Sequence, residues 1–247
     1  MPDDRAPDAD VEMRALRRGW TPLSVLRSLV IASLVLAVVI GAVYRYDDRT
    51  TLGWLAGILG LVATATGLQW LAHRAGSSAN PGGTEPGVRI GLTLGLLWVV
   101  EISVNNLLAP PIPGRDIFDD VIWAAISVAI VLAAAITAYR GGRFRVGVEV
   151  GAWSGLASGQ VACLTALSMV VVAMPAIVAD PLNVTEWAAR GGHTGAPGMA
   201  AYFALETFAG AFIHLIVLGP VFGLVLGVVG GAIGYAAART AARIPGR

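Results

Sequence analysis

The fold of this chain is decided by residues 199–238, which read MAAYFALETFAGAFIHLIVLGPVFGLVLGVVGGAIGYAAA. Within this run the only acidic or basic side chains are those of Glu206 and His214. A helix of roughly 20 apolar residues is enough to cross the hydrocarbon core of a bilayer. At about 1.5 Å per residue this run would extend some 60 Å, twice that thickness. The stretch therefore predicts a membrane helix that continues beyond the bilayer.

Five more apolar segments precede it, at about 22–44, 51–73, 88–109, 118–139 and 146–178. The 247 residues are 56% hydrophobic and only 13% charged, with a mean hydropathy of +0.71. These values exclude an ordinary soluble domain. They predict an all-α, polytopic integral membrane protein, a bundle of six transmembrane helices whose principal partner is the lipid bilayer. The formal net charge of +1 gives no reason to expect nucleic-acid binding.

Positive charge is concentrated in alternate gaps between the apolar segments. If the first segment enters from the cytoplasm, thirteen of the seventeen basic residues face that side. The thirteen are Arg5, Arg14, Arg17, Arg18, Arg27, Arg74, Arg89, Arg140, Arg143, Arg145, Arg239, Arg243 and Arg247. Because cytoplasmic loops carry the excess of basic residues, we expect both termini in the cytoplasm and a multi-pass location in the cell membrane.

The domain organisation follows from the same pattern. Residues 1–20 are expected to form a cytoplasmic polar arm, 21–239 the six-helix transmembrane domain and 240–247 a cytoplasmic tail. Thr21-Pro22 resembles a helix start, with a capping hydroxyl followed by proline in the first turn. Asp180-Pro181 has the same character and predicts a short external surface helix over 181–190.

The long sixth segment allows two interpretations. It can form one long helix kinked at Gly219-Pro220, or two spans that turn at this proline. Two spans would put the last three arginines outside and bury a tight turn without a polar residue. We therefore expect one kinked helix.

Glycines recur every four residues in the last two segments. One ladder is Gly147, Gly151, Gly155 and Gly159, and the other is Gly219, Gly223, Gly227 and Gly231. This spacing places each set on one helical face, where missing side chains allow two backbones to approach closely. The hypothesis is that the two helices pack in the cytoplasmic half and separate towards the outside. In the alternative, a ladder contacts a second copy or another membrane protein.

Four polar residues within the apolar segments form the candidate ligand- or ion-binding site: Glu101, Asn105, Glu206 and His214. A carboxylate at the bilayer centre costs roughly 2.5–3.5 kcal/mol, so it normally faces protein or water. Glu101 and Asn105 lie one turn apart, a spacing that allows a hydrogen bond. Helix-to-helix hydrogen bonding explains each residue alone; together they predict an outward-facing acidic pocket.

Other acids near this side have a simpler explanation. Asp116, Asp119 and Asp120 stand at the start of the fourth segment, where capping and the helix dipole favour carboxylates. Three scattered histidines have no zinc-ligand spacing, and no cofactor is expected.

Three classes of function are compatible with these features. The first is a small solute or ion transporter, or the membrane substrate-binding subunit of one, with the acidic pocket as its binding site. The alternative is a non-catalytic membrane assembly protein that associates through its glycine-ladder helices. An intramembrane enzyme ranks last, because the sequence contains no paired-histidine motif and no glycine-flanked serine nucleophile.

Overall fold

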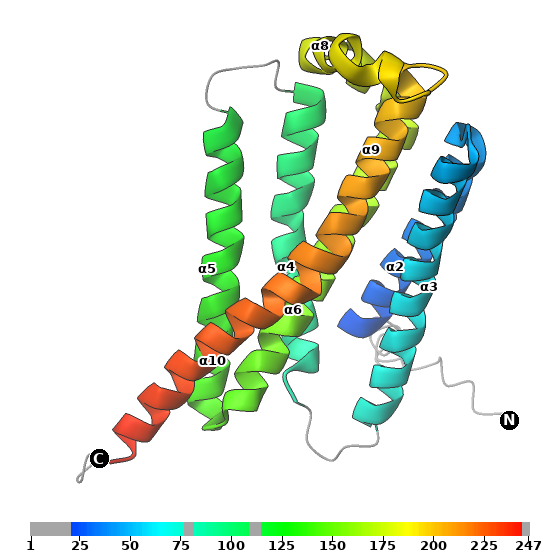
Figure 1. Cartoon of the computed structure of the whole chain (residues 1–247). Coiled ribbons are helices and arrows are strands. Elements are labelled where there is room, and N and C mark those ends of the chain that lie inside the picture. The colour runs from blue at the N-terminus through cyan, green and yellow to red at the C-terminus, as the bar shows by residue number, and fades with distance from the viewer. Residues whose placement is uncertain (1–20, 77–81, 109–114, 244–247) are drawn as a thin grey trace, which may run out of the picture.

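A computed structural model describes residues 21–76, 82–108 and 115–243, which form helices joined by short connections (Figure 1). The long helices are α2 (Pro22–Tyr44), α3 (Asp48–Gly76), α4 (Thr84–Ser103), α5 (Arg115–Gly141), α6 (Phe144–Val172), α9 (Met199–Ile213) and α10 (Phe222–Ala241), and the shorter elements are η1 (Val104–Leu108), α7 (Met174–Ala179), α8 (Pro181–Arg190), η2 (Gly191–His193) and η3 (His214–Val221). Six helical stretches within the described ranges are long and apolar enough to cross a membrane. The all-helical class and these six apolar helices are thus confirmed. The predicted arm, 1–20, and residues 244–247 of the predicted tail lie outside the described residues.

Helix α6 is the centre of the bundle. In its most apolar window 67% of the residues are buried, against 22–39% in the other five apolar helices. It contacts α2, α4, α5, α9, η3 and α10, whereas α3 packs mainly on α2 at the edge (Figure 1). Because α6 is surrounded by protein, its small residues set how closely the other helices approach.

The two glycine ladders face each other. A Cβ built on Gly147 would lie 2.7 Å from the Cα atom of Gly231, and one on Gly159 would lie 2.9 Å from that of Gly219. Between these ends, Gly151 meets Gly227 and Gly155 meets Gly223. Along the contact one residue number rises as the other falls, as antiparallel helices require. The backbone of α6 therefore touches that of η3 and α10 along the whole ladder.

Glycines also line the contact of α4 with α6 and the contact of α10 with α5. On α4, a Cβ at Gly91 would lie 2.7 Å from the Ala157 Cβ atom, and one at Gly95 would lie 2.6 Å from the Val161 Cβ atom. On the other side of α10, a Cβ at Gly230 would lie 2.8 Å from the Ala134 Cβ atom, and Gly234 meets Ala135. Close backbone approach thus joins α4, α6, α10 and α5 into one packed unit.

The fifth apolar segment is shorter than expected. The sequence predicts one stretch over 146–178, but α6 ends at Val172 and α7 starts at Met174. Pro175 explains the break, because its ring would clash with the carbonyl of Val171 if the helix continued. The prediction of a surface helix over 181–190 is confirmed as α8.

The last apolar segment is one continuous helical run from Met199 to Ala241. It changes from α-helix to π-helix at His214 and returns to α-helix at Phe222, with Pro220 inside the π-helical turns. Proline removes a backbone hydrogen bond and displaces the carbonyl four residues earlier, and the wider turns accommodate both effects. As expected, the segment is one run of helix without a turn, and its change of helix type begins at His214, five residues before the predicted kink at Gly219-Pro220.

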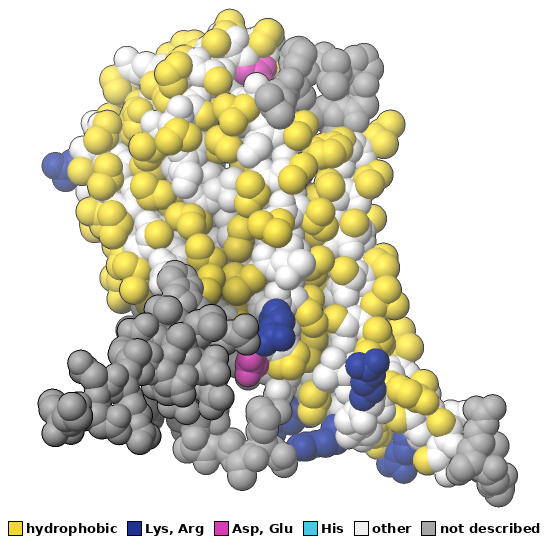
Figure 2. Space-filling view, turned by 180° about the vertical axis from the view of Figure 1, so that it is seen from behind, with side chains coloured by type: hydrophobic (Ala, Val, Ile, Leu, Met, Phe, Trp, Pro, Cys, Tyr) yellow, Lys and Arg dark blue, Asp and Glu magenta, His cyan; other side chains and the backbone are white. Residues whose placement is uncertain are grey.

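The two ends of the bundle differ in charge. Helix α2 begins and α10 ends at the same end of the bundle (Figure 1). We call this the Arg-rich end; its described arginines are Arg27, Arg74, Arg89, Arg140, Arg143, Arg145, Arg239 and Arg243. The opposite end, which we call the acidic end, carries Asp47, Asp48, Asp116, Asp119, Asp120, Asp180 and Glu186 together with Arg45, Arg49 and Arg190. A largely apolar surface lies between the two ends (Figure 2).

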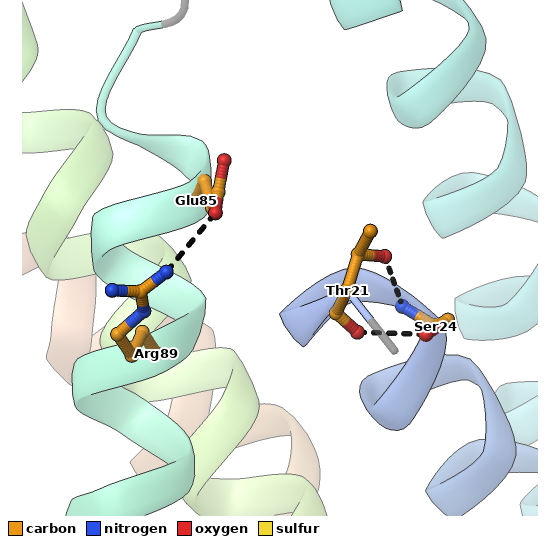
Figure 3. Close-up of polar contacts among 4 residues, drawn as sticks. All are labelled: Thr21, Ser24, Glu85 and Arg89. Atoms are coloured by element: carbon orange, nitrogen blue, oxygen red, sulfur yellow. Dashed lines mark hydrogen bonds and ion pairs between the residues drawn. The ribbon is translucent and has the colours of Figure 1, made fainter. Parts of the chain in front are cut away.

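Two helix starts have the predicted caps. The Ser24 backbone N–H donates to Thr21 Oγ1 at 3.2 Å, and the Ser24 hydroxyl donates to the Thr21 carbonyl oxygen at 2.7 Å (Figure 3). At α8 the Leu182 N–H donates to Asp180 Oδ1 at 2.9 Å. In both cases proline occupies the first turn, where its missing N–H removes no hydrogen bond.

Candidate functional site

A buried hydrogen-bonded group joins the ends of α4 and α5 that lie towards the acidic end. The side-chain nitrogen of Asn105 donates to Glu101 Oε1 at 2.9 Å and to Asp119 Oδ1 at 2.6 Å. Glu101 and Asn105 are 9% and 7% exposed, although both lie within an apolar helix. One amide therefore holds two carboxylates from neighbouring helices in a setting where polar groups are costly to bury. We call these three residues the carboxylate pair site.

Asn105 lies in the π-helical turn η1, which follows directly on α4. Asn106 of the same turn donates from Nδ2 to the Ile102 carbonyl oxygen at 2.8 Å. The site thus includes a residue from a local change of helix type, of the kind often found at functional sites.

The rings of Trp98, Trp123 and His214 contact one another next to the site, on the side away from the acidic end. Trp98, one turn before Glu101, is 3% exposed and contacts the Trp123 ring edge-on at a centroid distance of 4.6 Å. Trp123 follows Asp119 by one turn. Trp98 also contacts the imidazole of His214 at 5.1 Å. The His214 imidazole therefore lies against the two tryptophans that come one helical turn from Glu101 and Asp119.

The ring orientation of His214 is set by its own helix. Nδ1 lies 2.8 Å from the Gly210 carbonyl oxygen. A carbonyl oxygen can only accept, so we assign the proton to Nδ1 and leave Nε2 as an acceptor. This imidazole lies at the start of η3, so both π-helical elements contribute a residue to this region.

Glu206 does not join the carboxylate pair site. The buried residues of α9 include Ala204, Phe208 and Ala211, and Glu206 is exposed on a different face. Its charge acts near the α2–α3 connection, where burial first, and then Asp47 and Glu206, raise the pKa of Tyr46. The hydrogen bonds of Asn105 with Glu101 and Asp119 do not involve Glu206, so a pocket shared by Glu206 and Glu101 stays a prediction.

The second carboxylate that contacts Asn105 belongs to Asp119 and not to Glu206. Its position at the start of a helix is sufficient to explain a carboxylate, and no spacing in the sequence relates it to Asn105. One feature of the sequence did point to Asp119. Trp123 lies one helical turn from it, just as Trp98 lies one turn from Glu101. Only the packing of α4 against α5 brings the two pairs together.

Other polar residues bond helices to each other. Gln160 is fully buried in α6 and donates from Nε2 to Ser33 Oγ on α2 at 2.7 Å. Ser154 donates to the Gly87 carbonyl oxygen at 3.1 Å. Glu149 accepts from the Arg145 guanidinium at 2.9 Å and from the Gly83 N–H at 3.0 Å. These contacts give each of the three residues a structural role in the packing of the bundle.

Two further features bear on ligand chemistry. Within the described ranges no group of three His, Cys, Asp or Glu side chains is placed to hold a metal ion. A shallow recess at the Arg-rich end is lined by Gly82, Glu85, Pro86, Arg89 and Ile90. Its Arg89–Glu85 ion pair, at 3.2 Å, is exposed to solvent (Figure 3). Such a pair contributes little, and the recess is remote from the carboxylate pair site.

No protein-family model, characterised protein or solved structure matches this chain. The class is defined by the fold itself: an all-helical chain with six apolar helices, compatible with a multi-pass membrane protein.

Proposed function

We propose that this chain is a small solute or ion transporter of the cell membrane, or the membrane substrate-binding subunit of one. In this proposal the six apolar helices span the bilayer, and the Arg-rich end with both termini faces the cytoplasm. The carboxylate pair site then lies in the outward-facing half, where it binds a cation or a proton. This proposal replaces the pocket of Glu101 and Glu206 with one of Glu101 and Asp119.

The observation that supports the proposal most is the single Asn105 nitrogen bound to both carboxylates. The two carboxylate oxygens are no more than about 5.5 Å apart, because they contact the same atom. At an effective dielectric constant of 20, two unit negative charges at this separation repel by about 3 kcal/mol. A proton or a cation bound between them removes that repulsion. The site therefore has a chemical reason to take up positive charge.

The aromatic cluster adds to this reasoning. Trp98 and Trp123 separate the carboxylates from the half of the bundle where the glycine ladders join α6 and α10. Closely packed helices would thus separate a cation bound on the outer side from the Arg-rich end. His214 lies against Trp98 from η3, a π-helical segment of the kind often found at functional sites.

The assembly-protein alternative has less support. It requires the glycine ladders as a contact surface for a partner, and these ladders are occupied by each other. A partner or a second copy would have to use another face of the bundle.

Reconstitution of the full chain into liposomes tests the proposal. A pH-sensitive dye inside the vesicles and a panel of inorganic cations and organic amines outside would report solute-linked proton movement or uptake. We expect Glu101→Gln and Asp119→Asn to lose most of the signal. Asp120→Asn, an exposed neighbour of Asp119, and Glu206→Gln should retain it. An unchanged signal in both site variants, or no cation response in the native protein, would refute the proposal.

A further inference from the structure

The Arg-rich end contains one concentrated basic surface. It is formed where α5 ends, α6 begins and α10 ends, and we call it the arginine patch: Arg140, Arg143, Arg145, Arg239 and Arg243. All five residues are exposed. Dark-blue side chains gather at this end, next to the apolar surface of the bundle (Figure 2).

The helices of the patch are held together just above it. Gly230 and Gly234 of α10 lie against Val131 and Ala135 of α5. Both helices run towards the Arg-rich end, so their last turns follow directly from this contact (Figure 1). Arg140 and Arg239 are each five residues beyond it. The charges of the patch thus belong to two helices in fixed register.

Most of the patch has no acidic counterpart among the described residues of its own helices. No Asp or Glu occurs between Asp120 and Glu149, and none follows Glu206. Glu149 pairs with Arg145 at 2.9 Å. At the same end Arg89 is likewise paired, with Glu85. The patch therefore presents four arginines whose charge is not balanced by a nearby carboxylate on α5, α6 or α10.

One arginine of the patch is oriented by a tyrosine. Arg239 Nε donates to Tyr235 Oη at 2.9 Å, and its guanidinium carbon lies 5.3 Å from the centroid of the Tyr235 ring. The remaining guanidinium N–H groups can then contact an anion with less loss of side-chain freedom. Arginine is the side chain best suited to phosphate, because its planar donors match the phosphate oxygens.

Apolar side chains adjoin the same arginines. Tyr139 is 49% exposed, Phe144 is 41% exposed and Ile233 is 55% exposed. A free phosphate or nucleotide would make no use of this surface. A ligand with a phosphate headgroup and long hydrocarbon chains would fit both parts at once.

We propose that the arginine patch binds the headgroup of an anionic phospholipid in the leaflet at the Arg-rich end. The phosphate lies between the ends of α5 and α10, and the acyl chains follow the exposed apolar faces of the two helices. Basic residues at the edge of a membrane segment attract anionic lipids in this way. The inference does not depend on the carboxylate pair site.

Lipid retention by the purified full chain tests this inference. The protein in detergent would be titrated with phosphatidylglycerol, phosphatidylcholine or water-soluble glycerol phosphate, with bound ligand counted by native mass spectrometry and thermal midpoints recorded in parallel. We expect retention and stabilisation by phosphatidylglycerol alone. Replacing Arg140, Arg143 and Arg239 by Gln should weaken retention roughly 100-fold, about fivefold for each arginine removed.

A control variant loses the same number of positive charges outside the arginine patch. Arg49→Gln, Arg89→Gln and Arg190→Gln remove three exposed arginines outside the patch, two of which pair with a glutamate, and phosphatidylglycerol retention should stay within about twofold of the native value. Equal weakening in both triple variants would overturn the inference. So would an equal response to phosphatidylcholine, or full replacement of the lipid by glycerol phosphate. If the patch variant does not fold, the single change Arg239→Gln at the exposed end of α10 gives the same comparison against Arg190→Gln.

Discussion

Gly155 and Gly223 face each other so closely that a Cβ added to either one would lie 2.7 Å from the Cα atom of the other. Real Cβ atoms do not approach another carbon to this distance. The contact is made by backbone on both sides, so no side chain can move away to relieve it. This pair marks the middle of the interface between α6 and α10 and makes that interface sensitive to single substitutions.

Gly223→Ala should therefore destabilise the folded chain. The added methyl group also meets the Gly151 carbonyl oxygen at 2.7 Å, so the helices must separate. Overpacking of this kind typically costs about 1–3 kcal/mol. Thermal unfolding in detergent should show a lower midpoint for Gly223→Ala and no change for Gly53→Ala, because a Cβ at Gly53 meets nothing within 4 Å. A normal midpoint with loss only of a larger complex would instead favour a partner at this face.

The buried bond between Gln160 and Ser33 should stabilise the packing of α2 on α6. Ser33→Ala leaves the Gln160 amide without its 2.7 Å acceptor in a fully buried position. Hydrogen bonds between membrane helices contribute about 0.6 kcal/mol on average and up to about 1.7 kcal/mol. We expect a loss of that size, measured by unfolding in mixed micelles. In a double-mutant cycle with Gln160→Met, strictly additive losses would show that the two side chains do not interact.

The start of α3 should depend on pH. Asp47 Oδ1 accepts from the Thr50 N–H at 2.6 Å, and the Asp47 N–H donates back to Thr50 Oγ1 at 3.1 Å. The hydrogen bond from the Thr50 backbone is the main cause that lowers the pKa of the Asp47 carboxyl below its ordinary value of 3.8, and the Thr50 side chain adds to it. A lowered native pKa means that the ionised carboxylate stabilises the fold above the unfolded-state pKa. This contribution disappears as the pH falls through the native pKa.

Asp47→Ala should consequently lower the thermal midpoint at pH 7, and the difference from the native protein should vanish in strong acid. Asp47→Asn keeps an acceptor at the helix start but loses the charge, so it should fall between the two. If the thermal midpoints of native protein and Asp47→Ala differ by the same amount at neutral and at strongly acidic pH, the carboxylate charge has no part in the cap.

Much of this fold could be predicted from the sequence. Apolar runs of sufficient length locate six helices, and the spacing of Gly151 and Gly227 within their ladders indicates faces suited to close packing. Capping residues such as Thr21 define helix starts to the residue. The end of α6 was predicted less well, because the run stays apolar through Pro175 and hydropathy alone does not register the break.

The site was harder to predict for two physical reasons. Helix α9 is apolar over most of its surface, so its sequence has no periodicity that shows which face is buried and does not indicate that Glu206 is exposed. The contact of Asn105 with Asp119 depends on how α4 and η1 pack against α5. This packing is not encoded in local spacing. Glu101 and Asn105 were found because both partners lie on one helix.

The carboxylate pair site is most directly tested by difference infrared spectroscopy of the native protein in lipid, recorded as a cation is added at constant pH. We predict a carboxylic-acid C=O band that decreases on cation binding. This band should be absent in Glu101→Gln or Asp119→Asn and retained in Asp120→Asn and Glu206→Gln. A band that persists unchanged in Glu101→Gln and in Asp119→Asn, or a native spectrum that no cation alters, would contradict a shared site between these two carboxylates.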